Sequence, residues 1–406
     1  MRIVIICQWF LPEFAPIGVI LNELAQDLIA RGHEVTIVTG FPNHPDGIVF
    51  NGYKKKLFST EFIDGVKVVR CYLYTSPKKT FLRRLLNYIS FAVTSFLATL
   101  KLKNQDILFV VSPPLSNGLI ALALNKLKTL PYIFNVQDIY PDAAISTGVI
   151  TNKSAIRLLK KIEKFVYNNS NGISVISPNF KVNLCNKGVP QDKVSVIYNW
   201  IDTNEIVPLS KDNGFSFKHG LKDRFVVLYS GTIGLISGAE IILECAKKLI
   251  THKDIVFLFV GEGVVKDGLQ KQVQKFKLPN VKFLSFQPRK TLSQVQSSSD
   301  VSIVSLARGT GVTSVPSKVL GYMAAARPVI ASVDSDSDTH VLIENAQCGI
   351  CVGPGDSDAL VQSILSFYYD RNKAKSMGEN GRKFLIDNFH RTRITSQYEK
   401  LFTENV

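Results

Sequence analysis

Short apolar runs alternate with helix-like segments along most of the chain. Residues 2–7 form the first run, leucines at helical spacing follow from Gly18 to Gly32, and a second run begins at Glu34. A strand, a loop, a helix and a second strand within about forty residues make a βαβ unit, which predicts a parallel sheet with a right-handed crossover.

The same alternation continues through both halves of the chain. It predicts strands at 66–71, 106–112, 132–137, 173–176 and 194–198, and then at 225–229, 255–260, 281–284, 301–306, 329–333 and 350–352. In the second half it predicts helices at roughly 239–249, 268–276, 317–326 and 356–369. The polar stretch 202–223 joins the halves, so we expect two doubly wound α/β domains, as the length of 406 residues also suggests.

A loop leading into a helix, within residues 307–331, is a candidate phosphate site. The loop is rich in Gly, Thr and Ser and turns helical at Pro316, which fits the first helical position. The first N–H groups of a helix are unpaired and favour anions. Lys318 then lies in the first turn, where the helix dipole alone disfavours a cation. A phosphate shared by Lys318 and the helix end would explain that position; an ordinary solvated lysine is the alternative.

The composition is that of a globular protein, but its positive charge is concentrated. The chain is 46% hydrophobic and 20% charged, with a net charge of +15. Between Tyr53 and Lys103, eleven Lys and Arg residues accompany only Glu61 and Asp64, so this segment carries +9. Such density points to nucleic acid, an anionic membrane surface or a phosphorylated ligand. Nucleic acid is disfavoured because no nucleic-acid motif accompanies the charge.

Within this basic segment, residues 85–100 are mostly apolar. The run is shorter than the roughly twenty residues of a transmembrane span. One interpretation is a crossover helix in the core. The other is an interfacial helix whose apolar face enters the lipid while Lys79, Arg83 and Arg84 meet anionic headgroups. The start MRIVIIC lacks a signal-peptide pattern and the six cysteines are scattered, which together predict a cytoplasmic location.

Four loops at the carboxyl ends of predicted strands hold the candidate chemistry, because ligands bind there in open α/β sheets. They span residues 8–18, 136–142, 230–234 and 260–263. The first contains Glu13 and the last two are Gly-rich, which lets the backbone approach a ligand closely. In the second, Asp138 and Asp142 could form a hydrolytic carboxylate pair, although a loop-stabilising role is favoured for Asp142. His44 could line a cleft between the domains or be structural.

Other sites are not indicated. No Walker-type loop, Ser/His/Asp order or zinc spacing occurs. The Cys348–Cys351 spacing lies late in the chain, between a helix and a strand-like run, where we do not expect metal or redox chemistry.

Several segments together resemble the family 4 glycosyltransferases of the GT-B fold, in particular those that build bacterial O-antigen, capsule and colanic-acid-type polysaccharides. The segments are QWFLPEFAPIG from residue 8, RGHEVTIVTGFPNHP from 31, VQDIYPD from 136, VIYNWID from 196, YSGTIG from 229, PSKVLGYMAAARPVIAS from 316 and PGDSDAL from 354. The resemblance implies an acceptor-binding domain at 1–205 and a nucleotide-sugar-binding domain at 206–385, both Rossmann-like and facing across a cleft. It also implies that a helix at 386–406 packs back on the first domain.

The resemblance further assigns site residues. It implies nucleotide-sugar contacts from Gly231, Thr232, Gly234, Gly261, Glu262, Gly263, Phe286, Thr313, Ser314, Pro316, Ser317 and Lys318, and acceptor contacts from Pro16, Gly18, His44 and Asp138.

The chain also departs from this family. Members commonly carry Glu-x7-Glu where this chain has Thr313 and Gly321, and an Arg and a Lys where it has Thr232 and Ser237. Lys318 and Arg308 therefore become the expected diphosphate partners, and no residue is assigned to the ribose. Asp138 stands where many relatives have a histidine in the cleft.

The implied reaction is retaining transfer of an N-acetylated hexosamine or deoxyhexosamine from a UDP-sugar to an undecaprenyl-diphosphate-linked acceptor, without a cofactor or metal. Lys318 and Arg308 would stabilise the diphosphate, while Asp138 or Glu13 would orient or deprotonate the acceptor hydroxyl. The protein would associate peripherally with the anionic cytoplasmic face of the inner membrane. Alternatives are a UDP-N-acetyl-sugar epimerase of the same fold and a non-catalytic, membrane-associated polysaccharide-assembly module.

Overall fold

The computed structural model describes residues 1–13, 15–78 and 80–406, and its first elements form the predicted βαβ unit. Strand β1 (Arg2–Ile6) is buried from its second residue onward. Helix α1 (Pro16–Ala30) begins with a proline, and β2 (Glu34–Gly40) then pairs in parallel with β1. The expected membrane contact Lys79 lies outside the described residues.

The N-terminal half contains an eight-stranded sheet whose order is β3-β4-β2-β1-β5-β6-β7-β8. The further strands are β3 (Phe58–Ile63), β4 (Val66–Cys71), β5 (Ile107–Ser112), β6 (Tyr132–Val136), β7 (Gly172–Val175) and β8 (Val194–Val196). All pairings are parallel except that of β3 with β4, a hairpin at the edge. The predicted strands are confirmed, but β3 was not predicted, because its exposed, alternating residues do not form an apolar run.

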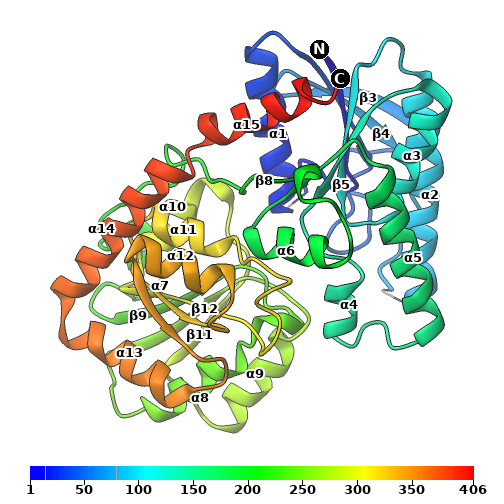
Figure 1. Cartoon of the computed structure of the whole chain (residues 1–406). Helices are drawn as coiled ribbons and strands as arrows, with labels where there is room; N and C mark the ends of the chain where they lie inside the picture. Colours follow the sequence, from blue (N-terminus) through cyan, green and yellow to red (C-terminus); the bar gives the residue numbers. More distant parts are fainter. Residues whose placement is uncertain (14, 79) are drawn as a thin grey trace. The chain divides into compact units, whose positions relative to one another are not determined.

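Helices cover both faces of this sheet (Figure 1). One face carries α2 (Phe81–Lys101), α3 (Ser116–Lys128) and α5 (Lys153–Asn169); α1 and α15 (Arg391–Thr403) lie on the other. The short helices α4 (Asp142–Ser146) and α6 (Pro178–Asn186) and a 3-10 turn (Gln191–Lys193) complete the connections. Residues 85–100 thus lie within α2, which connects β4 to β5. Phe91 and Ala98 are buried, but Ile89 and Val93 are exposed, so the helix is not enclosed in the core.

The C-terminal half contains an all-parallel sheet of six strands in the order β11-β10-β9-β12-β13-β14. They are β9 (Phe225–Ser230), β10 (Ile255–Val260), β11 (Val281–Leu284), β12 (Val301–Ser305), β13 (Val329–Ser332) and β14 (Gly349–Val352). Each strand lies where an apolar run predicted it. The strand order reverses direction between β9 and β12, so the loops after these two strands flank the position where doubly wound sheets bind ligands.

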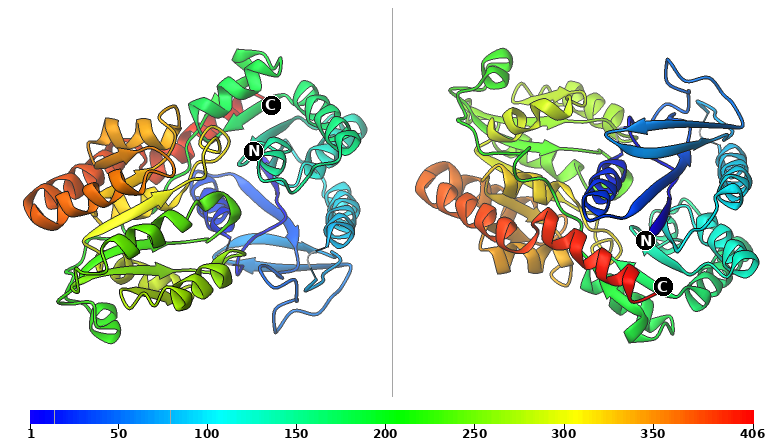
Figure 2. Two further views of the ribbon diagram at one scale, coloured as in Figure 1. Left: turned by 90° about the horizontal axis from the view of Figure 1, so that it is seen from below. Right: turned by 90° about the horizontal axis from the view of Figure 1, so that it is seen from above.

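The helices of this half also lie on both faces of its sheet (Figures 1 and 2). In chain order they are α7 (Gly214–His219), α8 (Glu240–Lys248), α9 (Lys266–Lys275), α10 (Leu292–Ser297), α11 (Lys318–Ala324), α12 (Asp338–Ala346), α13 (Ser357–Tyr369) and α14 (Arg371–Asn388), with 3-10 turns at Leu235–Ser237 and Arg289–Thr291. Helices α8, α9 and α13 lie below the sheet in Figure 1, and α10, α11 and α12 lie above it.

The chain divides into two compact units, and we describe each by itself. The N-terminal unit comprises Met1–Asn199 together with Thr392–Val406, and the C-terminal unit comprises Trp200–Arg391. These limits differ by six residues from the boundaries expected at 205 and 385. The fold is the predicted α/β class, with two doubly wound sheets that are parallel except for the β3–β4 hairpin.

Candidate functional site

Lys318 and Gly231 come together at the switch point of the C-terminal sheet. The loop after β9 contains Gly231, and Lys318 is the first residue of α11, which follows the loop after β12. The Lys318 Nζ atom lies 3.6 Å from the centre of the Tyr229 ring. A Cβ atom at Gly231 would lie 3.4 Å from Lys318 Cε, so the absent side chain leaves room for the lysine.

The Lys318 ammonium has no counterion in the part of the chain that the structure describes. It forms no hydrogen bond or ion pair there, and its one polar contact is with the Tyr229 ring. Burial lowers the pKa of Lys318 to about 7, because the charged form loses hydration that no anion replaces. A bound anion would supply the missing charge.

Gly261 and Gly263 allow two loops of the protein to approach each other. A Cβ atom at Gly261 would lie 2.0 Å from the Gly231 carbonyl oxygen, and one at Gly263 would lie 2.2 Å from that of Ile233. The Gly231 N–H donates to the Val260 carbonyl at 2.9 Å across the same contact. The sequence suggested that these glycines let a ligand approach the backbone. In the structure, the space beside them is filled by the backbone of the loop after β9.

Two tyrosines, which the sequence alone does not single out, hold the end of β9. The Ser230 N–H donates to the Tyr322 hydroxyl at 2.8 Å, and the Tyr229 hydroxyl donates to the Thr232 carbonyl at 2.9 Å. Both tyrosines lie within the segments that carry the family resemblance, but their role depends on contacts that the sequence does not display.

Helix α11 begins later than predicted. Its first residue is Lys318, and Ser317 precedes it as the cap residue, so Pro316 is not at the first helical position. The reason is a tight turn ahead of the helix, in which the Val319 N–H donates to the Pro316 carbonyl at 3.2 Å. The Ser317 side chain is exposed and makes no capping hydrogen bond.

The remaining predicted donor residues are dispersed over nearby loops. Arg308 is exposed, and its Nη2 atom donates to the Pro354 carbonyl at 3.2 Å rather than to any group at Lys318. The Thr313 hydroxyl donates to the Thr310 carbonyl, and Glu262 pairs with Lys266 at 2.8 Å. The others are partly or fully exposed and comprise Thr232, Gly234, Phe286 and Ser314.

Glu13, in the N-terminal unit, ties two loops together. It is 2% exposed, and its Oε1 atom accepts the N–H groups of Asn43 and His44, each at 2.8 Å. Its Oε2 atom accepts the Phe10 N–H at 3.1 Å. Burial raises the pKa of Glu13, and the three backbone donors oppose that rise. A carboxylate held in this way positions the loops after β1 and β2.

Buried Arg70, which has no motif to mark it in the sequence, supports the same loops. Its guanidinium donates to the carbonyls of Leu11 and Gly40 and pairs with Glu61 at 2.6 Å. The only sign of this role in the sequence is one arginine inside the apolar run VKVVRC.

Asp138 is the carboxylate among the predicted acceptor residues, and it is free to interact with a substrate. It is exposed in the loop after β6 and forms no hydrogen bond or ion pair with the described residues. The surrounding protein nevertheless displaces enough water to raise the pKa of Asp138 to about 6. Because that pKa is still below 7, the carboxylate is mostly ionised at neutral pH, and its exposure leaves it able to accept a hydrogen bond.

Asp142 has the structural role that was favoured for it. Its carboxylate lies 2.8 Å from Lys187 Nζ, which also pairs with buried Glu163 at 2.6 Å. This cluster joins α4, α5 and α6, so Asp142 is not a free partner for Asp138.

The other predicted acceptor residues lie around the β1–α1 loop. Pro16 is exposed at the start of α1. A Cβ atom at Gly18 would lie 3.0 Å from Phe10 Cα, so glycine allows the helix to pack on the loop backbone. His44 is exposed, and its ring lies 5.8 Å from that of Trp9.

The start of α2 borders these loops. The Gln8 amide donates to Asn87, and the Asn87 amide donates to the Tyr74 carbonyl at 2.7 Å. Burial raises the pKa of Tyr140, in the loop of Asp138, and the nearby Tyr88 and Arg84 on α2 also influence it. Arg83 donates to the Ser76 hydroxyl at 2.6 Å. In the described part of the chain no helix combines the length and apolarity needed to cross a membrane.

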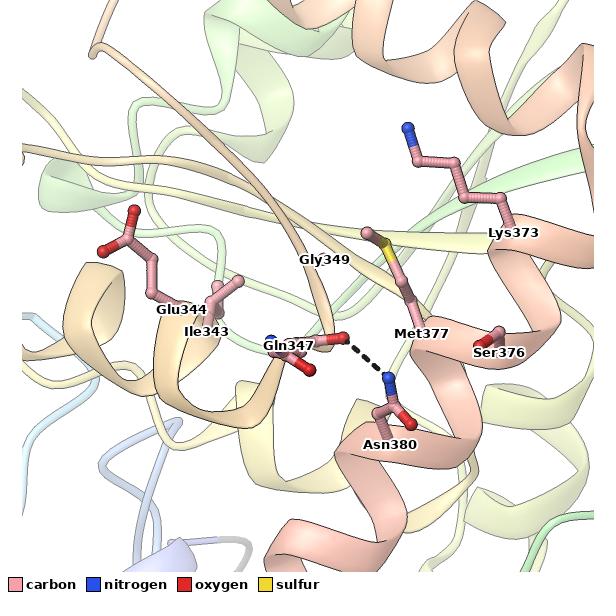
Figure 3. Close-up of a pocket in the computed structure, with 8 residues that line it drawn as sticks. All are labelled: Ile343, Glu344, Gln347, Gly349, Lys373, Ser376, Met377 and Asn380. Carbon is pink, nitrogen blue, oxygen red and sulfur yellow. Dashed lines mark hydrogen bonds between the residues drawn. The ribbon is translucent and has the colours of Figure 1, made fainter.

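A pocket on the C-terminal unit contains none of the predicted residues (Figure 3). It lies between α12, β14 and α14 and is lined by Ile343, Glu344, Gln347, Gly349, Lys373, Ser376, Met377 and Asn380. Gly349 begins β14, so the pocket is at the amino end of that strand, away from the loops that surround Lys318.

Comparison with known proteins identifies both halves. Residues 17–200 match the glycosyl transferase 4-like domain and residues 212–384 match the glycosyl transferases group 1 family. The putative colanic acid biosynthesis glycosyl transferase WcaI of Escherichia coli is 28% identical over 375 residues, 90% of this chain and 91% of that protein.

Solved structures share the fold. Sucrose-phosphate synthase from Thermosynechococcus elongatus aligns over 99% of this chain and 98% of its own, with a TM-score of 0.77 and 18% identity. Anabaena HepE, solved with UDP and glucose, aligns over 100% of both chains with a TM-score of 0.75 and 15% identity. With two family matches that together span most of its length, the chain belongs to the group 1 glycosyltransferases of the GT-B fold and is a sugar-transferring enzyme.

Proposed function

We propose that the protein transfers a sugar from a UDP-sugar to a lipid-linked acceptor in the synthesis of a bacterial surface polysaccharide, with retention of configuration. The main support for a nucleotide-sugar donor is the Lys318 ammonium, which lies at the switch point of the C-terminal sheet without a counterion among the described residues. Relatives support the rest: WcaI is named for colanic acid biosynthesis, and HepE was solved with UDP and with UDP-glucose.

Donor binding is assigned to the loops after β9 and β12. The diphosphate would pair with Lys318 and restore the full charge that burial suppresses. Pre-placed positive charge of this kind stabilises the UDP that leaves as the sugar–phosphate bond breaks, and such stabilisation often contributes more to catalysis than any other effect. Arg308 is assigned a secondary role, because it is exposed and already donates to Pro354.

Acceptor activation is assigned to Asp138. The acceptor oxygen is held on the side of the leaving phosphate and bonds to the anomeric carbon as the bond from that carbon to the phosphate oxygen breaks. The electron pair leaves with UDP, and the configuration is retained. The hydroxyl proton is accepted or oriented by the Asp138 carboxylate. Glu13 is assigned a positioning role, since its carboxylate already receives three backbone N–H groups.

The first test is thermal unfolding with UDP, GDP, dTDP and CMP in parallel. UDP at 100 times its dissociation constant should stabilise the protein by about 2.7 kcal/mol. The variant Lys318→Ala should lose most of this effect and nearly all transfer, while Lys271→Ala, an exposed lysine on α9, should retain both. Stabilisation by another nucleotide alone would overturn the UDP assignment, and wild-type turnover by Lys318→Ala would remove that residue from the mechanism.

A further inference from the structure

One side of α2 is a continuous stripe of exposed apolar side chains. They are Leu82, Leu85, Leu86, Ile89, Val93, Leu97 and Leu100. They recur every three or four residues, so they project from one side of the helix. The stripe is well exposed at its centre, with Ile89 at 51% and Val93 at 54%. The opposite side packs on the sheet through residues such as Phe91 and Ala98.

Two neighbouring helices extend this apolar surface. Helix α2 packs against α3, and α3 packs against α5, on the same side of the N-terminal sheet (Figure 1). Leu119 and Leu127 are exposed on α3, and Leu158 and Phe165 are exposed on α5. We call the outward side of these three helices the α2–α3–α5 face.

The charge on this face has one sign. The three helices contain ten basic residues, namely Arg83, Arg84, Lys101, Lys126, Lys128, Lys153, Arg157, Lys160, Lys161 and Lys164. Their one acidic residue, Glu163, is 3% exposed and pairs with Lys187 at 2.6 Å. The three helices therefore present exposed cations and apolar groups without an exposed carboxylate.

We propose that the α2–α3–α5 face docks on an anionic bilayer surface. The apolar stripe of α2 enters the boundary between headgroups and acyl chains, and the lysines of α5 meet the lipid phosphates. A second copy of the chain is a poorer occupant, because it would place the exposed lysines of α5, such as Lys160, Lys161 and Lys164, against an equally basic face. An acidic partner protein would neutralise the basic residues, but it would not explain the long apolar stripe on α2.

The docked face borders the acceptor loops, and here the inference rests on the proposed function. Arg84 and Tyr88 near the start of α2 lie close to Tyr140, two residues from Asp138. An acceptor anchored in the bilayer would carry its diphosphate at headgroup level, beside this end of α2. The structure changes one detail of the sequence-based expectation: Arg83 is bonded to Ser76, so the lipid contacts are assigned to α5 instead.

Co-sedimentation with vesicles tests the docking. The full-length protein should bind vesicles of phosphatidylglycerol and phosphatidylethanolamine and should bind phosphatidylcholine vesicles far more weakly. The pair Lys161→Gln with Lys164→Gln should weaken binding about 25-fold, since each basic residue near an anionic surface contributes a factor of about five. The pair Ile89→Gln with Val93→Gln should weaken it about a hundredfold, because two anchoring side chains are lost.

A matched control removes two exposed lysines elsewhere, Lys271→Gln with Lys383→Gln on α9 and α14, and should bind vesicles as the wild type does. UDP-induced stabilisation is measured on every variant and should be unchanged. Vesicle binding unaffected by both test pairs, or a dimer that both pairs abolish, overturns the docking proposal. A protein that binds vesicles but is not stabilised by UDP keeps the docking surface and contradicts the proposed donor.

Discussion

At the scale of single residues, the donor proposal depends on the surroundings of Lys318. Its ammonium lies against the Tyr229 ring and beside the backbone of Gly231. The ring attracts a cation, but it does not replace the hydration lost on burial, so the pKa of Lys318 falls to about 7. A diphosphate would raise that pKa again, and binding is therefore linked to the uptake of a proton.

This linkage predicts how UDP affinity depends on pH. Above pH 7 the free protein loses the Lys318 proton, and UDP must restore it before the ion pair can form. The affinity should fall as pH rises from 7 to 8.5, by up to about tenfold per pH unit. Calorimetry in buffers of different ionisation enthalpy would measure the proton uptake. A flat affinity across this range, or the same slope in Lys318→Met, would contradict the assignment.

Asp138 gives a second prediction. Asp138→Asn should lower kcat by about 10² to 10⁴-fold, the usual contribution of a general base, and leave UDP-induced stabilisation unchanged. Because the raised pKa places protonation near pH 6, wild-type activity should fall as pH drops through that value, and the variant should lack this acid limb. Asp142→Asn, at the start of α4 directly after this loop and paired with Lys187, is the matched control and should keep the acid limb.

At the scale of elements, the loops after β9 and β10 can lie close together because glycines at their contact have no side chains. The loop after β10 approaches the loop after β9 so closely that a Cβ atom at Gly261 would meet the Gly231 carbonyl. The site around Lys318 therefore depends on a backbone contact as well as on its own side chains.

Gly261→Ala should separate these loops. The substitution should destabilise the C-terminal unit by more than about 2 kcal/mol, because backbone atoms must move, and should abolish UDP-induced stabilisation. Gly268→Ala, in α9, is the control: its Cβ would meet no atom within 4 Å, and alanine should stabilise the helix by about 0.5–1 kcal/mol. Thermal unfolding with and without UDP measures both, and UDP binding by Gly261→Ala would show that the contact is dispensable.

How far the sequence predicts an element depends on where its stabilising contacts lie. Strands such as β9 and β10 were predictable because both faces are buried and the sequence reads as an apolar run. Edge strand β3 was not, since Phe62 is 71% exposed. The role of Glu13 was also hidden, because two of its partners are backbone N–H groups some thirty residues away. The sequence identifies Lys318 as a candidate, but its place beside Tyr229 is a tertiary contact.

At the scale of the whole molecule, α15 completes the N-terminal unit. The rings of Tyr398 and Phe402 lie 5.3 and 5.2 Å from that of Phe109 on β5. The Tyr398 hydroxyl also accepts from Asn135 at 3.2 Å, and Gln137, beside Asp138, donates to Asn135 at 2.8 Å. The end of α15 is thus connected, through Asn135, to the loop after β6 that contains Asp138.

Phe402→Ala should therefore destabilise the N-terminal unit by about 3–5 kcal/mol, through the cavity it leaves beside Phe109. UDP should still stabilise the C-terminal unit, so that unfolding separates into two transitions. Phe217→Ala, which removes a ring that is 81% exposed, should change stability by less than about 0.5 kcal/mol. One unshifted transition for Phe402→Ala would show that α15 is not part of the stable core.

Because α15 belongs to the N-terminal unit but is the last helix in the chain, this unit can be completed only at the end of translation. Residues 1–199 leave the ribosome first, yet the side of their sheet around Phe109 stays uncovered until α15 has been translated. At 5–20 residues per second the intervening unit takes roughly 10–40 s to make. During that time the nascent chain exposes an apolar surface that chaperones can bind. A chain broken off before residue 391 lacks α15 and keeps that surface exposed, so we expect a prematurely terminated product to be held by chaperones or degraded.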